Sequence, residues 1–79
     1  MTASSLVKRS LALSGHRTSV ALEPEFWNAL DALAITRGQT LIALVAAEDA
    51  ARDPARSLAS ALRVLALNAA GGNDRLIPG

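Results

Sequence analysis

The segment from His16 to Trp27 constrains the fold of this chain more than any other part of it. From His16 to Leu22, apolar residues alternate with small or polar ones, which is the pattern of a strand with one buried face. Pro24 follows almost at once, and its fixed φ suits the first position of a helix. A lone short strand does not form a stable sheet, so the sequence predicts an intertwined dimer with a basic ribbon on its surface.

Length and composition strengthen the case for a dimer. The chain has 79 residues, enough for one small domain, and a chain of this size buries only about 60% of the surface it exposes when unfolded. It contains no cysteine, which excludes disulfides and thiolate metal sites. Hydrophobic residues make up 51% of the chain, but most are Ala and Leu, with one Phe, one Trp and no Tyr. This composition favours helices and offers few large core side chains.

Positive charge is concentrated near the N-terminus. Residues 1–22 contain three cations and no acid, whereas residues 23–51 contain five acids and one cation. This asymmetry indicates an anionic partner for the first segment, although a solvated strand with scattered cations would have the same composition. The chain has no apolar run as long as a membrane span and no signal-peptide core after Lys8 and Arg9, so we expect a cytoplasmic protein that does not bind a membrane.

The first 22 residues also predict a hairpin. Residues 14–15 are Ser-Gly, which can form a two-residue loop that pairs residues 7–13 with residues 16–22. One face of this hairpin would be mostly apolar, and because Lys8 and Arg9 are adjacent, only one of them can lie on the other face. That other face would carry the small or basic side chains of Lys8, Ser10, Ala12, Arg17, Ser19 and Ala21.

Two helices are expected next. The first begins at Pro24 and ends before Gly38, with apolar residues at helical spacing between them. Thr40 has the hydroxyl that caps the second helix, which ends near Arg52, just ahead of an Asp-Pro pair.

A third helix follows a short link. Ser57 can cap it, and its end is expected within residues 69–74, which include two glycines. The apolar stripe of this helix consists of Leu58, Ala61, Leu62 and Leu65. An exposed stripe of this kind would be unfavourable, so we expect the helix to pack on the domain. The sequence thus predicts one domain over residues 1–70 and a flexible tail over residues 71–79.

This order of a strand, a helix, a glycine-containing turn and a helix resembles the ribbon-helix-helix family of dimeric bacterial DNA-binding proteins. The resemblance is carried by RTSVALEPEFW at residues 17–27, RGQTL at residues 37–41 and ALV at residues 43–45. In addition, KRSLALSGHRTSV at residues 8–20 and LASALRV at residues 58–64 resemble a small subfamily with an added N-terminal strand and C-terminal helix. We therefore expect a mainly α fold with a short β-ribbon, forming an intertwined homodimer.

The resemblance implies a binding site for double-stranded DNA. In the family, two subunits pair one strand each into an antiparallel ribbon that enters the major groove, where alternate residues touch base edges. The matching base-contacting positions are Arg17, Ser19 and Ala21. The expected phosphate contacts are Lys8, His16 and the backbone N–H groups of Gln39, Thr40 and Leu41 at the start of the second helix. The expected dimer core consists of Val20, Leu22, Trp27, Leu30, Leu41 and Val45.

Two functions are compatible with this resemblance. The first is a transcriptional regulator, such as a repressor, that binds DNA as a dimer. The second is an antitoxin-like module that binds a protein partner through its C-terminal helix, with DNA binding secondary. The net charge of only +1 and Ala21, where many members carry a polar or basic residue, favour the second. The acid-free basic strand and the short apolar C-terminal helix favour the first.

The residue pattern gives no support to catalysis. His16 is the only histidine, and it has no carboxylate or second imidazole at ligand spacing. No serine has a general base arranged near it in sequence, and the glycine pair at residues 71–72 lacks the lysine and helix of a phosphate-binding loop. We therefore expect no enzymatic activity, no metal and no cofactor.

Overall fold

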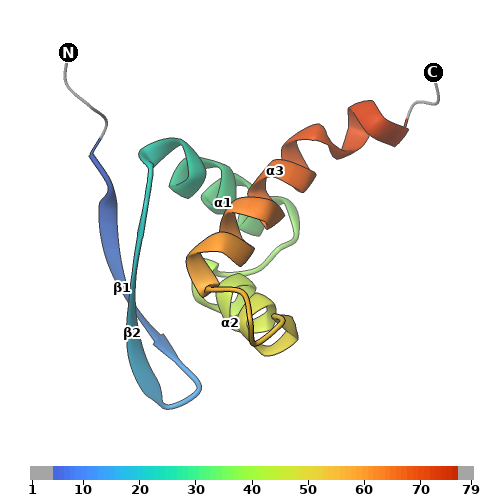
Figure 1. Cartoon of the computed structure of the whole chain (residues 1–79). Coiled ribbons are helices and arrows are strands. Elements are labelled where there is room, and N and C mark those ends of the chain that lie inside the picture. Colours follow the sequence, from blue (N-terminus) through green and yellow to red (C-terminus); the bar gives the residue numbers. More distant parts are fainter. Residues whose placement is uncertain (1–4, 77–79) are drawn as a thin grey trace.

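A hairpin is followed by three helices in the computed structural model, which describes the backbone of residues 5–76 and the side chains through residue 71 (Figure 1). The elements are β1 (Val7–Leu13), β2 (His16–Leu22), α1 (Pro24–Thr36), α2 (Leu41–Ala51) and α3 (Leu58–Leu76). The helices lie together on one side of the hairpin, and the other side of the hairpin faces away from them (Figure 1). Within the described part of the chain, no single helix has the length and apolarity of a membrane span, and α1 and α2 reach that length only as a pair bent by 100°.

The hairpin has the predicted register. β1 and β2 pair antiparallel, with Leu13 opposite His16 and Val7 opposite Leu22. Ser14 and Gly15 form the loop with φ of 46° and 86°. Positive φ at both central residues defines the type I′ turn, whose twist matches that of paired strands. The local turn therefore sets which side chains face the helices.

Local signals also fix both ends of the connection between α1 and α2. Pro24 opens α1, as expected, and Gly38 ends it with a φ of 67°. The N–H of Gln39 donates to the Ala34 carbonyl at 2.8 Å, which completes a Schellman-type helix end. Thr40 then caps α2, because its Oγ1 accepts a hydrogen bond from the N–H of Ala43 at 3.0 Å. The predicted boundaries of these two helices are confirmed.

Helix α3 is longer than the sequence indicated. Its start is as predicted, with Ser57 Oγ accepting from the N–H of Ser60 at 3.1 Å. The expected end within residues 69–74 is wrong, because the helix continues to Leu76. Gly71 does not adopt the positive φ of a helix-ending glycine. Each glycine costs only about 1 kcal/mol relative to alanine in a helix, too little to stop one that has already formed. A flexible tail over residues 71–79 stays a prediction, and residues 1–4 and 77–79 lie outside the described residues.

The core lies between the inner face of the hairpin and the three helices. Alternate residues of both strands point into it, and each helix adds one apolar stripe. Its fully buried side chains of largest volume are Trp27, Leu13, Leu22, Leu30, Leu44, Leu62 and Val45. Helix α3 contacts α1, α2 and β2. The prediction that the third helix packs on the domain is therefore confirmed.

Candidate nucleic-acid interface

The hairpin side chains that point away from the helices form one polar and basic surface, which we call the ribbon face. It consists of Lys8, Ser10, Ala12, Arg17, Ser19 and Ala21, of which all but the half-buried Ala21 are exposed. In the register, Ser10 lies opposite Ser19, Lys8 opposite Ala21, and Ala12 opposite Arg17. Two hydroxyls therefore occupy the middle of the face, with one cation toward each end and on opposite strands. The predicted outward direction of Arg17, Ser19 and Ala21 agrees with this register.

The two cations of the ribbon face carry uncompensated charge. Among the described residues, neither Lys8 nor Arg17 forms an ion pair, whereas Arg9, Arg52 and Arg63 each pair with a carboxylate. The ribbon face itself contains no acid. Lysine and arginine offer only donors, and serine both donates and accepts. The ribbon face can therefore bind an anionic surface that also presents hydrogen-bonding groups.

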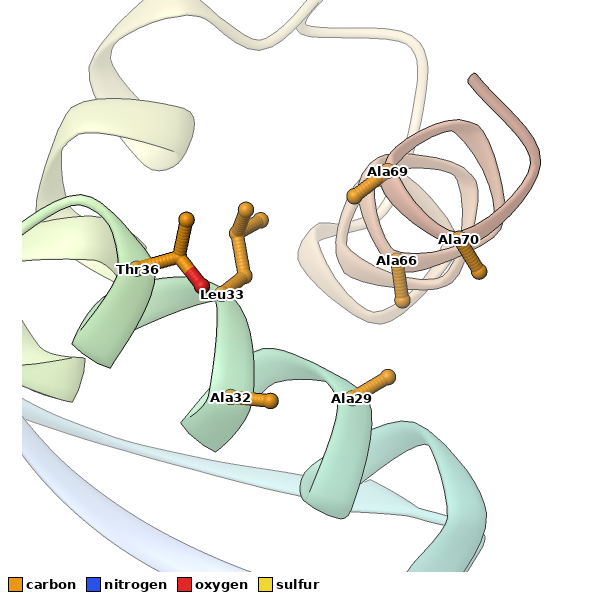
Figure 2. Close-up of a pocket in the computed structure, with 7 residues that line it drawn as sticks. All are labelled: Ala29, Ala32, Leu33, Thr36, Ala66, Ala69 and Ala70. Atoms are coloured by element: carbon orange, nitrogen blue, oxygen red, sulfur yellow. The ribbon is translucent and has the colours of Figure 1, made fainter. Parts of the chain in front are cut away.

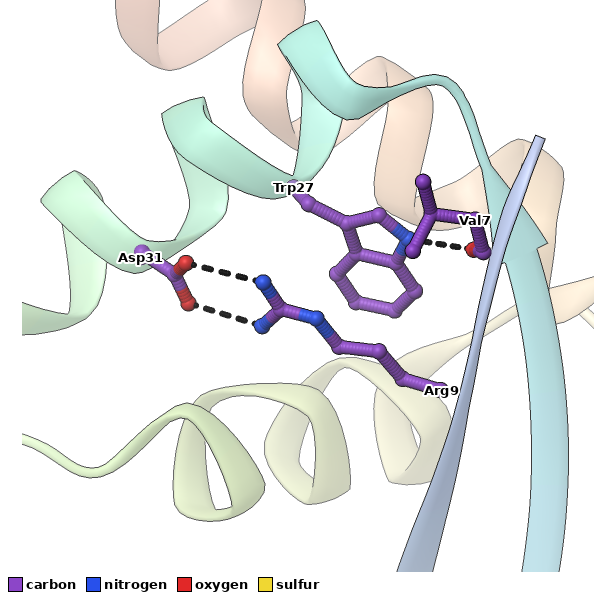
Figure 3. Close-up of polar contacts among 4 residues, drawn as sticks. All are labelled: Val7, Arg9, Trp27 and Asp31. Atoms are coloured by element: carbon purple, nitrogen blue, oxygen red, sulfur yellow. Dashed lines mark hydrogen bonds and ion pairs between the residues drawn. The ribbon is translucent and has the colours of Figure 1, made fainter. Parts of the chain in front are cut away.

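Arg9 lies on the inner face of β1 and connects that strand to α1 (Figure 3). Its Nη1 and Nη2 each donate to one carboxylate oxygen of Asp31 at 3.1 Å. The guanidinium lies over the Trp27 ring, with Cζ 4.6 Å from the ring centroid. The Trp27 Nε1 in turn donates to the Val7 carbonyl at 2.7 Å. The choice between Lys8 and Arg9 is thereby resolved, with Lys8 on the ribbon face and Arg9 fixing the strand from behind.

A second ion pair connects α3 to the junction between β2 and α1. Arg63 Nε donates to Glu23 Oε1 at 3.0 Å, and the guanidinium lies 5.9 Å from the Phe26 ring centroid. A hydrogen bond from the backbone of Glu23 and a second from Arg63 lower the pKa of the Glu23 carboxyl. Sequence reasoning missed both this pair and the Arg9–Asp31 pair. The one available signal in the sequence was Arg9, a cation on the otherwise apolar face of the predicted strand. A cation on such a face needs an anionic partner.

The start of α2 supplies a different set of free N–H groups from the one that the resemblance implied. The N–H of Gln39 is already donated to the Ala34 carbonyl, so in this conformation it is not available to a phosphate. Among the described residues, the N–H groups of Thr40, Leu41 and Ile42 have no backbone acceptor. These unpaired groups, together with the helix dipole, favour an anion at this end of α2. Gln39 and Thr40 are exposed there, and Leu41 is half-buried.

His16 occupies a different position from the other predicted phosphate contacts. It is exposed at the start of β2, opposite Leu13 and beside the loop. Because side chains alternate along a strand, His16 lies on the same face as Thr18 and Val20, opposite to the ribbon face. The structure therefore does not bring it together with Lys8 and Arg17.

The residues expected in a dimer core are covered by their own chain. Five of them, Val20, Leu22, Trp27, Leu30 and Val45, are buried within the single chain, and Leu41 is half-buried. Their burial accordingly needs no second copy. The backbone of β2 also needs none for pairing on this side, because β1 supplies the partner strand. A role for these residues in a dimer stays a prediction.

An open groove lies between α1 and α3 (Figure 2). It has a volume of about 330 Å³ and is lined by Ala29, Ala32, Leu33, Thr36, Ala66, Ala69 and Ala70. The Thr36 hydroxyl is the one polar side-chain group of this lining, whereas a ligand pocket needs several converging polar groups.

Among the described residues, no three His, Cys, Asp or Glu side chains are placed to hold a metal ion.

Comparison with known proteins gives one match. Neither the curated proteins nor the solved structures include a match to this chain. A family model described as "Ribbon-helix-helix domain" matches residues 6–70, which extend from the residue before β1 into α3. This match covers both the added N-terminal strand and most of the C-terminal helix. The chain therefore belongs to the ribbon-helix-helix domain family, whose members are in general dimeric DNA-binding regulators.

Proposed function

We propose that this protein is a sequence-specific DNA-binding regulator of transcription that acts as a homodimer in the cytoplasm. The observation that carries the proposal is the ribbon face, an exposed two-stranded surface with two unpaired cations, two hydroxyls and no acid. The major groove of DNA, about 12 Å wide, admits a two-stranded β-ribbon, which the β2 strands of two copies would form. Specific binding to a duplex is the function that this face fits best.

Each β2 residue of the ribbon face has a role in this proposal. Arg17 has the paired donors that recognise guanine, and Ser19 can bond several bases. Ala21 offers only a methyl group, which can contact thymine. Lys8 contacts phosphate, as do the free N–H groups at the start of α2. A side chain as small as that of Ala21 predicts modest discrimination at its base position.

The open edge of β2 is the proposed dimer contact. In a hairpin with a two-residue loop, the residues that flank the loop bond to each other, and the bonding direction then alternates along the strand. The N–H and C=O groups of Arg17, Ser19 and Ala21 accordingly point away from β1. Pairing this edge with the same edge of a second copy would satisfy these groups and join two ribbon faces.

Selection of bound sequences from a random duplex pool tests the proposal. The expected result is a recurring motif with two-fold symmetry, because a symmetric dimer reads two equivalent half-sites. Arg17→Ala should weaken binding to that motif, whereas Arg56→Ala, which removes an exposed cation from the link between α2 and α3, should not. Failure to enrich any motif would refute sequence-specific binding.

An antitoxin-like role is the second candidate, and one observation favours it. Val64 and Leu67 are exposed on α3, although both are large and apolar. In this alternative, these residues bind a protein partner and DNA binding is secondary. Weak and nonspecific binding to every duplex, together with tight binding of one protein through α3, would favour the alternative over the regulator.

A further inference from the structure

The hairpin adds β1 to the surface that would meet DNA. On the ribbon face, Ser10 of β1 lies directly opposite Ser19 of β2, and Lys8 lies opposite Ala21. Ser10 and Lys8 are both exposed. The base-contacting residues assigned above all come from β2. Which groups of DNA β1 would contact depends on where it lies relative to the sugar-phosphate walls of the major groove.

The spacing between neighbouring strands gives the position of β1 in a dimer that forms by pairing of two β2 strands. The dimer would then have a four-stranded sheet, with the two β2 strands in the centre and one β1 strand on each side. Since neighbouring strands lie about 4.8 Å apart, each β2 axis is about 2.4 Å from the two-fold axis and each β1 axis about 7 Å from it. The walls of a major groove about 12 Å wide lie about 6 Å from its centre. The β2 strands therefore fit inside the groove, and the β1 strands do not.

We propose that β1 binds the sugar-phosphate walls of the major groove, with the Ser10 hydroxyl and the Lys8 ammonium as its contacts, while β2 alone reads bases. This proposal rests on the proposed function and adds Ser10 as a DNA contact. Ser10 is the critical residue, because its short side chain reaches a phosphate only if β1 itself lies over the wall. Lys8 has a long side chain and could reach a phosphate from several positions.

The fixed position of β1 supports this assignment. The bidentate pair of Arg9 with Asp31 and the bond from Trp27 to the Val7 carbonyl hold both sides of Lys8 against α1. A strand held in this way keeps the Ser10 hydroxyl and the base of the Lys8 side chain in a fixed position relative to the helices. Contacts to phosphate of this kind fix the register of a protein on DNA without reading sequence.

The test measures binding of the full chain to its selected duplex and to a random duplex over a range of salt concentrations. Ser10→Ala should weaken both complexes by the same factor, about tenfold for the two hydroxyls of a dimer. Lys8→Ala should lower the slope of log affinity against log salt by about 1.8, since two phosphate contacts are lost. Arg56→Ala serves as the charge-matched control, and an unchanged melting temperature shows that each variant is folded.

The outcomes separate this inference from the proposed function. If Ser10→Ala reduces discrimination between bases at one position of the motif, β1 lies inside the groove and the inference is wrong. It is also wrong if Ser10→Ala binds both duplexes as tightly as the parent while Arg17→Ala loses specificity. If Arg17→Ala has no effect on either duplex, the ribbon face is not the DNA-reading surface and the proposed function itself fails.

Discussion

Arg9 and Asp31 form a bidentate ion pair across 22 positions of sequence, with both nitrogen-to-oxygen distances at 3.1 Å. The pair fastens the inner face of β1 to the middle of α1, beside the Trp27 ring (Figure 3). It lies directly behind Lys8 and Ser10 of the ribbon face. The orientation of that face relative to the helices thus depends on a contact that does not itself touch the proposed ligand.

Arg9→Ala should lower the free energy of unfolding by about 0.5 to 2 kcal/mol. The ion pair is partly exposed and contributes up to about 1 kcal/mol, and the cation over Trp27 adds about 0.5 to 1 kcal/mol. Arg9→Lys should recover only part of this, because lysine cannot form the bidentate pair. Urea denaturation of Arg9→Ala, Asp31→Ala and the double variant gives the coupling energy. A coupling energy of zero would show that the pair does not stabilise the fold.

Arg17→Ala should affect DNA binding and Val20→Lys should affect folding, although the two residues lie only three positions apart on β2. Arg17 is exposed on the ribbon face, so its loss should leave the melting temperature unchanged and weaken the specific complex by about 1 to 3 kcal/mol. The Val20 side chain is only 5% exposed, and a lysine there would bury an unpaired charge and unfold the protein. Circular dichroism and duplex titrations measure the two effects. A folded Val20→Lys variant would contradict the observed register.

Leu62→Asp and Leu67→Asp form a matched pair on α3. Leu62 is fully buried, so a carboxylate there should lower the free energy of unfolding by about 3 kcal/mol or more. Leu67 is 66% exposed, and the same substitution there should change it by less than about 0.5 kcal/mol. Thermal melts compare the two variants. If Leu62→Asp melts like the parent, α3 does not pack as described and the antitoxin-like alternative gains support.

The Glu23 carboxyl should make stability depend on pH in the acid range. Folding lowers the pKa of Glu23, so the unfolded chain binds this proton more tightly than the folded one. The ionised Glu23 carboxylate, held by the backbone hydrogen bond and by Arg63, therefore stabilises the protein fully above the ordinary glutamate value of 4.5, and this contribution is lost as the pH falls through the lower pKa of the folded state. Glu23→Gln should flatten this part of the stability profile. An identical profile for the parent and Glu23→Gln would show that the Glu23 carboxyl has no such role.

The melting temperature of the parent protein should rise with protein concentration. A dimer that forms through the open edge of β2 gains stability by mass action, whereas a monomer does not. Calorimetry over a hundredfold range of concentration, with sedimentation to measure the dimer content, provides the measurement. A constant melting temperature and a monomeric mass would refute the proposed dimer.

Local sequence determined most of the fold. The Ser14-Gly15 loop set the register of the hairpin, and with it the membership of the ribbon face. Pro24, Gly38 and Thr40 fixed the ends of α1 and the start of α2. These features were predictable because each depends on the φ preference or the hydrogen-bonding capacity of a residue and its near neighbours.

Tertiary structure decided what depends on residues far apart in sequence. The partners of Arg9 and Arg63 lie 22 and 40 positions away, and only packing of the helices on the hairpin brings them together. The Gln39 N–H was predicted to bind phosphate, but the end of α1 places the Ala34 carbonyl next to it. The burial of Trp27 within one chain, by β1 and the helices, was likewise not evident from the sequence, which indicated only a place for it in a dimer core. Sequence patterns specify which side of a helix or strand is apolar. The three-dimensional arrangement determines which distant residues pack against that side.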